Sequence, residues 1–195
     1  MLQEKLKDYH IILASGSPRR QQFFKDLGIT FEVRLKDVEE IYPDRLKASD
    51  IPDYLSQIKA LPLKDNLKEK EILITSDTIV WSENKALGKP KNEKEAFEII
   101  RSLSGKSHEV ITSVCFTTKD FQKTVNSITK VYFKEFTEEE IRFYIDNFKP
   151  YDKAGSYGIQ EWIGIIGVTK IEGSYFNVMG LPTHLVYKTL MNIVS

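Results

Sequence analysis

Short apolar runs alternate with amphipathic stretches along the 195 residues of the chain. An apolar run of about four to eight residues predicts a buried strand, and apolar residues spaced three or four positions apart predict a helix. This pattern predicts strands near residues 10–15, 31–35, 71–81, 109–118, 124–136 and 162–172. It predicts helices near residues 18–27, 49–60, 92–103, 137–148 and 181–194.

Capping residues indicate where three of these helices begin. Ser17 is a favourable N-cap, and Pro18 at the first helical position costs no hydrogen bond, because an N–H there would have no helical partner. Asn92 and Thr137 each precede a glutamate by three residues, which is the spacing of a capping box. The apolar periodicity and the end signals therefore agree at these three places.

The strand pattern also predicts how the sheet is built. The turn residues Lys119 and Asp120 separate two β-rich segments and predict a hairpin, so at least one pair of strands runs antiparallel. Elsewhere strands and helices alternate, and no repeat, low-complexity tract or change of composition divides the chain. The sequence therefore predicts an α/β fold: a single domain over residues 1–195 with a mixed, twisted sheet flanked by helices.

Charge and cysteine content narrow the range of partners. The 28 Lys and Arg residues balance 28 Asp and Glu residues, so no net field attracts nucleic acid or an anionic membrane. Cys115 is the only cysteine and cannot form an internal disulfide, which fits a reducing compartment. Residues 1–10 are charged, and no apolar run is long enough to span a bilayer. We expect a soluble, cytoplasmic protein in which any phosphate-binding charge is local.

The segment ASGSPRR, residues 14–20, is the first candidate for chemistry. It lies between a predicted strand and a predicted helix, where free backbone N–H groups and the helix dipole favour an anion. Gly16 allows a ligand to approach the backbone, and Arg19 and Arg20 occupy the first turn, where the dipole disfavours cations. A phosphate held between amides and guanidinium groups explains both arginines. A capped helix with solvated arginines is the alternative.

The second candidate is Asp77 in the segment TSDTIVW. The segment is otherwise apolar, and burying a carboxylate is costly unless it is paired or bound to a metal. Asp77 therefore suits a metal ligand or a base that takes a proton from water. An aspartate that caps a turn at the end of the strand is the simpler alternative. The tripeptide GKP, which contains Lys89, follows and can bring a lysine to the same edge.

Two loops supply further polar groups. Residues 151–160, YDKAGSYGIQ, alternate small and polar side chains, and Gln160 offers a donor and an acceptor that can read the edge of a base. Residues 173–182, GSYFNVMGLP, join a strand to a helix. Ordered turns explain both loops equally well. The three histidines lack metal-ligand spacing, and Cys115 lies in an apolar strand, where a core position is favoured over a nucleophile.

Taken together, these segments resemble the Maf family of nucleotide pyrophosphatases. The motifs occur in order from about residue 11 onwards: ASGSPRR, VEE, the lysine of QIKA, SDTIV, GKP, LSGKSHEVITSV, DKAGSYGIQ and GSYFNVMGLP. Eight matches in order are far more specific than any one of them. The resemblance implies a mixed α/β fold related to inosine-triphosphate pyrophosphatases, a site in a cleft, and a homodimer.

Matched position by position, the resemblance implies a role for each candidate residue. Asp77 would be the general base, and Glu40 and Asp77 would bind a divalent metal cation, Mg²⁺ or Mn²⁺. The residues implied to surround the triphosphate are Ser15, Ser17, Arg19, Arg20, Lys59 and Lys89. Water would attack the α-phosphorus of a nucleoside triphosphate and release a nucleoside monophosphate and pyrophosphate.

Three separated positions, Arg19, Thr78 and Gln160, resemble the branch of the family that acts on dTTP and UTP. The branch that acts on 7-methyl-GTP typically has a bulky aromatic residue, a glutamine and a Lys-Ser-Glu segment there. A glutamine amide can pair with the neighbouring carbonyl and N–H of uracil or thymine. The implied substrates are therefore dTTP and UTP, with modified pyrimidine nucleotides as an open extension and 7-methyl-GTP as the alternative.

Two positions depart from the family pattern, and a rival function remains. Glu39 stands where Asp is common, which keeps a carboxylate, and Glu161 follows Gln160 where Gly is usual, a departure that bears on the exit geometry of the loop. Maf-like proteins have also been linked to septum formation and division arrest, so a non-catalytic nucleotide-binding regulator is the rival. Such a module needs a phosphate clamp but not Asp77, and the presence of Asp77 with Glu40 favours an enzyme.

Overall fold

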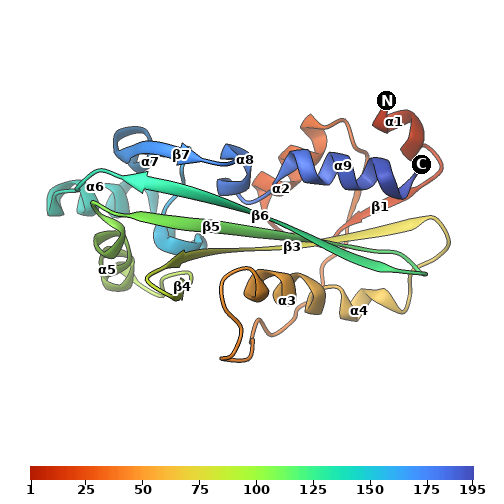
Figure 1. Ribbon diagram of the computed structural model, residues 1–195, viewed down its shortest axis with the longest axis horizontal. Coiled ribbons are helices and arrows are strands. Elements are labelled where there is room, and N and C mark those ends of the chain that lie inside the picture. Colours follow the sequence, from red (N-terminus) through yellow and green to blue (C-terminus); the bar gives the residue numbers. More distant parts are fainter. The chain divides into compact units, whose positions relative to one another are not determined.

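The computed structural model describes all residues from 1 to 195 and contains nine α-helices, two 3₁₀ helices and seven strands (Figure 1). In chain order these elements are α1 (Leu2–Leu6), β1 (His10–Leu13), α2 (Pro18–Asp26), β2 (Glu32–Val33), α3 (Asp50–Ile58), α4 (Leu61–Lys64), β3 (Glu71–Ser82), β4 (Lys85–Leu87), α5 (Glu93–Leu103), β5 (Ser107–Thr117), β6 (Gln122–Phe133), α6 (Glu138–Phe148), η1 (Pro150–Asp152), η2 (Ala154–Ser156), α7 (Trp162–Gly167), β7 (Val168–Glu172), α8 (Tyr175–Val178) and α9 (Thr183–Ile193). The five predicted helices are all present. None of the helices is long and apolar enough to cross a membrane.

The strands form one seven-stranded sheet in the order β2-β1-β3-β5-β6-β7, with β4 paired to β3 outside this path. β1 is parallel to both β2 and β3, with Ile12 opposite Glu32 on one side and Leu73 on the other. β4 is antiparallel to β3, and β7 is antiparallel to β6. Thr118 N donates to Phe121 O at 2.9 Å between β5 and β6, as expected of a hairpin turn. The predicted α/β fold with a mixed sheet is confirmed.

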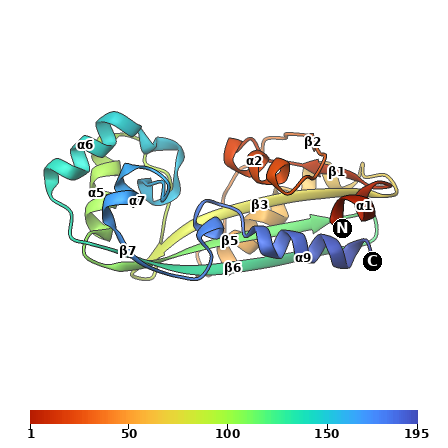
Figure 2. The ribbon, with the colours of Figure 1, turned by 90° about the horizontal axis from the view of Figure 1, so that it is seen from above.

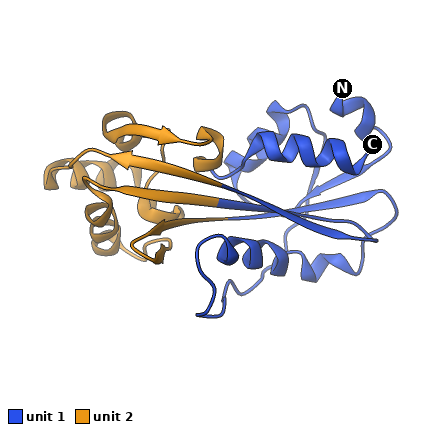
Figure 3. Ribbon diagram, in the orientation of Figure 1, with its two compact units in different colours: residues 1–77, 112–127, 180–195 blue, residues 78–111, 128–179 orange.

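The chain divides into two compact units, and each unit draws on separated segments (Figure 3). Unit 1 comprises residues 1–77, 112–127 and 180–195, and unit 2 comprises residues 78–111 and 128–179. The strands β3, β5 and β6 each contribute residues to both units. The single domain over residues 1–195 stays a prediction.

In unit 1, helices cover both faces of the strands (Figures 1 and 2). The helices α1, α2 and α9 lie on one face, and α3 and α4 lie on the other. The residues Ile11, Ile12 and Leu13 of β1 are almost completely buried, which explains why this strand is apolar without interruption. α1 packs against α9, and Lys5 Nζ donates to Ser195 Oγ at 3.2 Å, so the two ends of the chain meet in this unit.

In unit 2, α5 packs against α6, and α6 packs against α7. An aromatic cluster centres on Phe133, whose ring lies 5.0 Å from that of His108, 5.1 Å from that of Phe136 and 4.9 Å from that of Tyr157. His108 Nε2 and the Tyr157 hydroxyl lie 2.7 Å apart and form a buried hydrogen bond. Burial lowers the pKa of His108 to about 4, so its ring is neutral at pH 7.

The three predicted helix starts are confirmed. The side chains of Ser17, Asn92 and Thr137 each accept a hydrogen bond from the backbone N–H three residues further on. At α6 the Glu140 carboxylate also accepts from Thr137 N at 3.0 Å, which completes a capping box. These starts depend on neighbouring residues alone, and for that reason the sequence predicts them well.

The prediction of a continuous strand over residues 162–172 is wrong in its first half. Residues 162–167 form α7, and only residues 168–172 form β7. The run WIGIIG is too short for its period to separate a strand from a buried helix. Tertiary packing decides, because a Cβ at Gly167 would lie only 2.1 Å from Phe136 Cζ. α7 therefore packs directly against the aromatic cluster of unit 2.

Candidate active site

The candidate phosphate site lies where β1 leads into α2. The hydroxyl of buried Ser15 accepts from Ser17 N at 3.3 Å, and the Ser17 hydroxyl accepts from Arg20 N at 3.5 Å. A Cβ at Gly16 would meet only Leu35 Cδ1, at 3.7 Å, so the backbone there is open to approach. The turn in front of α2 is therefore held by its own side chains and accessible at its glycine.

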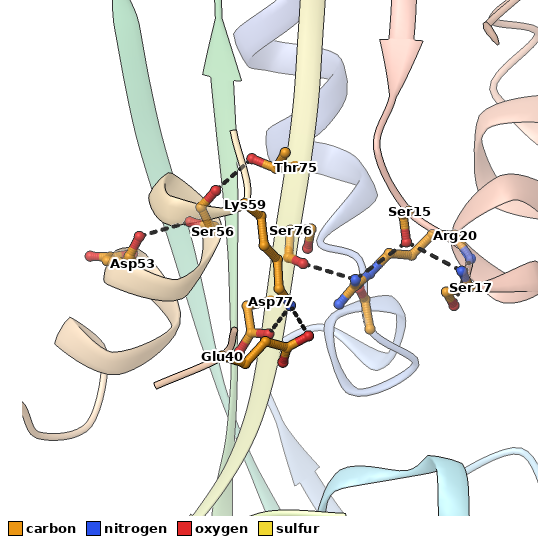
Figure 4. A network of polar contacts seen from close by, with 11 residues as sticks. Ser15, Ser17, Arg20, Glu40, Asp53, Ser56, Lys59, Thr75, Ser76 and Asp77 are labelled. Carbon is orange, nitrogen blue, oxygen red and sulfur yellow. Dashed lines mark hydrogen bonds and ion pairs between the residues drawn. The ribbon is translucent and has the colours of Figure 1, made fainter. Parts of the chain in front are cut away.

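Arg20 carries a tethering role in addition to the phosphate contact that the sequence predicts. Its Nε donates to Gly180 O at 2.8 Å, and its Nη1 donates to Ser76 O at 2.9 Å (Figure 4). Burial lowers the pKa of the Arg20 guanidinium and the Asp77 carboxylate raises it, and an arginine stays charged under either influence. Arg20 thus ties α2 to β3 and to the segment that leads into α9.

Three charged side chains meet beside β3 (Figure 4). Lys59 Nζ lies 2.6 Å from Asp77 Oδ1 and 3.1 Å from Glu40 Oε1. The Asp77 side chain is 9% exposed and that of Lys59 18%, whereas that of Glu40 is 48% exposed. One ammonium group therefore links a nearly buried carboxylate to a half-exposed one.

The packing of α3 on β3 places Lys59 beside Asp77. Side chains alternate along a strand, so Thr75 and Asp77 lie on the same face of β3. Thr75 Oγ1 donates to Ser56 O at 2.6 Å, and Ser56 Oγ donates to Asp53 O at 2.9 Å. The buried hydrogen bond from Thr75 holds α3 on β3, and Lys59 follows directly at the end of this helix. The distance between the ammonium and the carboxylate is thus set by the scaffold.

The pair Glu40 and Asp77 fits the ligand chemistry of a hard cation. No group of three or more His, Cys, Asp or Glu side chains that could hold a metal ion occurs in the structure. Mg²⁺ nevertheless binds to proteins through one or two carboxylates and takes its other ligands from water and phosphate. Two carboxylates that converge on one ammonium, as these do on Lys59 Nζ, meet that requirement.

The other sequence-predicted residues are placed as follows. Arg19 is half-buried in the first turn of α2, in unit 1. Thr78, Lys89 and Gln160 belong to unit 2, where Lys89 is exposed and the other two are half-buried. The structure gathers six predicted residues in one polar network of unit 1 (Figure 4): Ser15, Ser17, Arg20, Glu40, Lys59 and Asp77.

Sequence reasoning missed the residues that hold this network in place. Thr75, Ser76 and Gly180 act through a hydroxyl or a backbone carbonyl that meets a distant segment. Such contacts leave no signal in residue spacing. Lys153 was also missed, although it lies in a predicted loop; its Nζ is 3.2 Å from Glu161 Oε1. The only available signal in the sequence was Glu161, which stands where the family usually has glycine.

Cys115 is part of the core, as the sequence predicts. Its side chain is buried and forms no disulfide. Burial raises the pKa of the Cys115 thiol, which disfavours the thiolate that a nucleophile requires.

Comparison with known structures gives the fold. The chain resembles the structure of the Staphylococcus aureus Ham1 protein, with a TM-score of 0.51 and 13% sequence identity. The match covers 94% of this chain and 99% of that chain. At this level of identity the likeness shows a shared fold and agrees with the predicted fold class.

Comparison of sequences gives the family. The family model described as Maf-like protein matches residues 10–193, and the chain therefore belongs to the Maf-like protein family. A protein of Flavobacterium johnsoniae named dTTP/UTP pyrophosphatase is 63% identical over 194 residues, which cover 100% of both chains. A protein of Christiangramia forsetii with the same name is 61% identical over 195 residues, again 100% of both chains. The predicted family is confirmed.

Proposed function

We propose that the chain is a nucleoside triphosphate pyrophosphatase that hydrolyses dTTP and UTP to the nucleoside monophosphate and pyrophosphate. Its full-length relatives with more than half of their residues identical bear the name of this activity. The observation that carries the proposal is the convergence of Asp77, Glu40 and Lys59 on β3. Asp77 directly follows Ser76, whose carbonyl binds Arg20 from the start of α2.

In the proposed mechanism, Asp77 is the general base. Lys59 binds Asp77 Oδ1 at 2.6 Å and fixes the orientation of the carboxylate, which leaves Oδ2 to accept a proton from water. The oxygen of that water attacks the α-phosphorus, and the bond from the α-phosphorus to the oxygen that bridges to the β-phosphate breaks. Pyrophosphate leaves with that oxygen, and no side chain forms a covalent bond with the substrate.

Glu40 and Asp77 are the residues that would hold Mg²⁺ or Mn²⁺. The Lys59 ammonium already lies between the two carboxylates, which supports the proposal that a cation is accommodated there. When bound, a divalent metal would lower the pKa of water and neutralise phosphate charge. Lys59, at the end of α3, would stay bound to Asp77 Oδ1 and add its positive charge beside the phosphates.

The triphosphate would be bound by the start of α2 and by basic side chains. Ser15 and Ser17 shape the turn, and its backbone N–H groups together with the helix dipole favour phosphate. Arg19 and the exposed Lys89 would neutralise the leaving pyrophosphate. Arg20 would hold the start of α2 in register with β3 while it contributes charge.

The base would be selected by three residues. The amide of Gln160 would pair with the carbonyl and N–H of uracil or thymine. Arg19 would repel the positively charged ring of a 7-methylated guanine, and Thr78 would contact the nucleotide. Modified pyrimidine nucleotides fit the same recognition.

The remaining properties of the proposed enzyme follow the family pattern. We propose a homodimer of single-domain chains in the cytoplasm, with no nucleic acid or membrane as partner. The balance of 28 basic and 28 acidic residues supports the proposal that neither nucleic acid nor an anionic membrane is a partner, because it gives no net field for a polyanion.

The decisive experiment is a substrate panel with purified protein. Pyrophosphate release from dTTP, UTP, CTP, ATP, GTP and 7-methyl-GTP is measured with Mg²⁺ and with Mn²⁺. We expect the highest kcat/KM for dTTP and UTP. A preference for 7-methyl-GTP or another purine would remove the base assignment and leave the reaction type intact. Tight nucleotide binding without pyrophosphate release would instead favour the non-catalytic regulator.

A further inference from the structure

The turn that carries Gln160 is tied to the body of unit 2 by a buried tyrosine. Tyr144 in α6 is fully buried, and its hydroxyl donates to Glu161 Oε2. The same hydroxyl accepts a hydrogen bond from Gly158 N at 3.0 Å. Burial, and after it the Glu161 carboxylate, raises the pKa of Tyr144, so the hydroxyl keeps its proton and remains a donor. One side chain thus binds both ends of the segment Gly158–Glu161.

Lys153 holds the same carboxylate from its other side. Its Nζ lies 3.2 Å from Glu161 Oε1 and 2.7 Å from Asp152 Oδ1, and its side chain is 9% exposed. Both oxygens of Glu161 therefore have a partner, a neutral hydroxyl on one and an ammonium on the other. A charge-assisted hydrogen bond of this kind is roughly twice as strong as a neutral one.

The backbone on both sides of Gln160 has little freedom. Glu161 N donates to Gly158 O at 3.0 Å, which closes the turn. A Cβ at Gly158 would lie 2.7 Å from Glu161 Cδ, and a Cβ at Gly164 would lie 2.0 Å from Ile159 O. The turn is therefore packed tightly against its own glutamate and against α7. In contrast, Gln160 is half-buried, and its amide is not used in a hydrogen bond within unit 2.

We propose that Tyr144, Lys153 and Glu161 are positioning residues for recognition of the pyrimidine base. They hold the turn so that the amide of Gln160 presents its donor and its acceptor in one fixed orientation. Two simultaneous hydrogen bonds to a base require such an orientation, and a shift of about 1 Å is enough to lose them. This inference rests on the proposed function, in which Gln160 reads the base.

The test compares Tyr144→Phe and Glu161→Gln with Gln160→Ala and with the double variant Tyr144→Phe/Gln160→Ala. Steady-state kinetics are measured for dTTP, UTP and GTP. We expect KM for dTTP and UTP to rise about tenfold in each of the first two variants, with kcat changed less than about threefold and GTP unaffected. In the double variant, loss of the tyrosine hydroxyl should add nothing to the effect of Gln160→Ala, because both act on the same contact.

Tyr132→Phe is the matched control. The Tyr132 hydroxyl donates to Glu172 Oε2 at 3.1 Å at an exposed position. The substitution therefore removes another Tyr–Glu hydrogen bond of unit 2. We expect wild-type kinetics from this variant. If Tyr144→Phe fails to fold, Glu161→Gln provides the same comparison.

Two results separate this inference from the function on which it rests. Equal losses for dTTP and GTP, or effects that add to that of Gln160→Ala, would mean that the three residues only stabilise the fold. In that case wild-type protein still prefers dTTP and UTP, and the proposed function stands. Wild-type protein that prefers purines would overturn both.

Discussion

Two lysines, one in each unit, have nearly the same surroundings. Lys59 Nζ in unit 1 lies 2.6 and 3.1 Å from two carboxylate oxygens, and Lys153 Nζ in unit 2 lies 2.7 and 3.2 Å from two others. Their side chains are 18% and 9% exposed. Distance and burial alone therefore do not distinguish the proposed catalytic ion cluster from a structural one.

The two clusters differ in what else their carboxylates bind. In unit 2, Lys153 and Tyr144 occupy both oxygens of Glu161. In unit 1, the Lys59 ammonium is the hydrogen-bonding partner of Asp77, on one oxygen only. A carboxylate with an unused oxygen can accept a proton or bind a cation, whereas a saturated one can only hold its neighbours in place. We infer that unused acceptor capacity, more than the ion pair itself, marks the reactive cluster.

The substitution Asp77→Asn tests the proposed difference between the two clusters with the largest expected effect. The amide keeps the size of the side chain but cannot act as a base, so we expect kcat to fall by on the order of 10³-fold while nucleotide binding persists. Pyrophosphate release and calorimetric binding of dTTP measure the two effects separately. The control is Glu69→Gln, which removes one carboxylate of the exposed Lys119–Glu69 ion pair in the same unit and should leave kcat unchanged. Near-normal turnover of Asp77→Asn would exclude Asp77 as the base.

Substitution of Lys59 and of Lys153 by methionine compares the two clusters directly, because both changes remove an ammonium and keep the approximate length of the side chain. For Lys153→Met we expect unfolding free energy to fall by about 3 kcal/mol, because a saturated, largely buried pair loses one partner. That loss lowers Tm by roughly 6 to 12 °C in a protein of this size. For Lys59→Met we expect a similar loss of about 3 kcal/mol, because Asp77 stays nearly buried without its partner, and in addition a fall in kcat of about 100-fold. A larger fall in kcat for Lys153→Met than for Lys59→Met would invert the assignment of the two clusters.

A smaller effect concerns the pH dependence of stability in unit 2. Burial lowers the pKa of His108 from 6.5 to about 4, so the unfolded chain binds the proton first as pH falls. The contribution of His108 to unfolding free energy is therefore complete above about pH 6.5, falls between pH 6.5 and 4, and reaches a loss of about 2 kcal/mol near pH 4.5. His108→Gln should remove this part of the pH dependence in urea denaturation. Identical pH profiles for the two proteins would contradict the shift.

The sequence predicted best what depends on neighbouring residues. The caps Ser17, Asn92 and Thr137 need only a backbone N–H three positions away, and all three are present. The helix α7 was mistaken for a strand because its six residues carry no clear period and the contact of Gly167 with the distant Phe136 decides its packing. Local signals therefore gave the helix starts, and long-range packing gave the exception.

The candidate site was predicted in its residues but not in its connections. Polarity within an apolar strand singled out Asp77, and motif resemblance added Lys59 and Glu40, but no spacing indicates that one ammonium bridges both carboxylates. The tether from Arg20 to Gly180 O spans 160 positions and leaves no pattern in the sequence. Residue type and motif thus predicted which residues meet in this network, and only the fold reveals which groups share a partner.

The division of unit 1 into three segments has a consequence for synthesis on the ribosome. Residues 1–77 emerge first, but they form their unit with residues 112–127, which emerge after the first segment of unit 2, and with residues 180–195, which emerge after all of it. Until Gly180 leaves the exit tunnel, Arg20 lacks one of its carbonyl partners, and α9 does not yet cover its face of the strands. Contacts this distant form late, and the apolar surface exposed in the meantime favours aggregation. The nascent chain is therefore expected to depend on chaperones until its last helix has been translated.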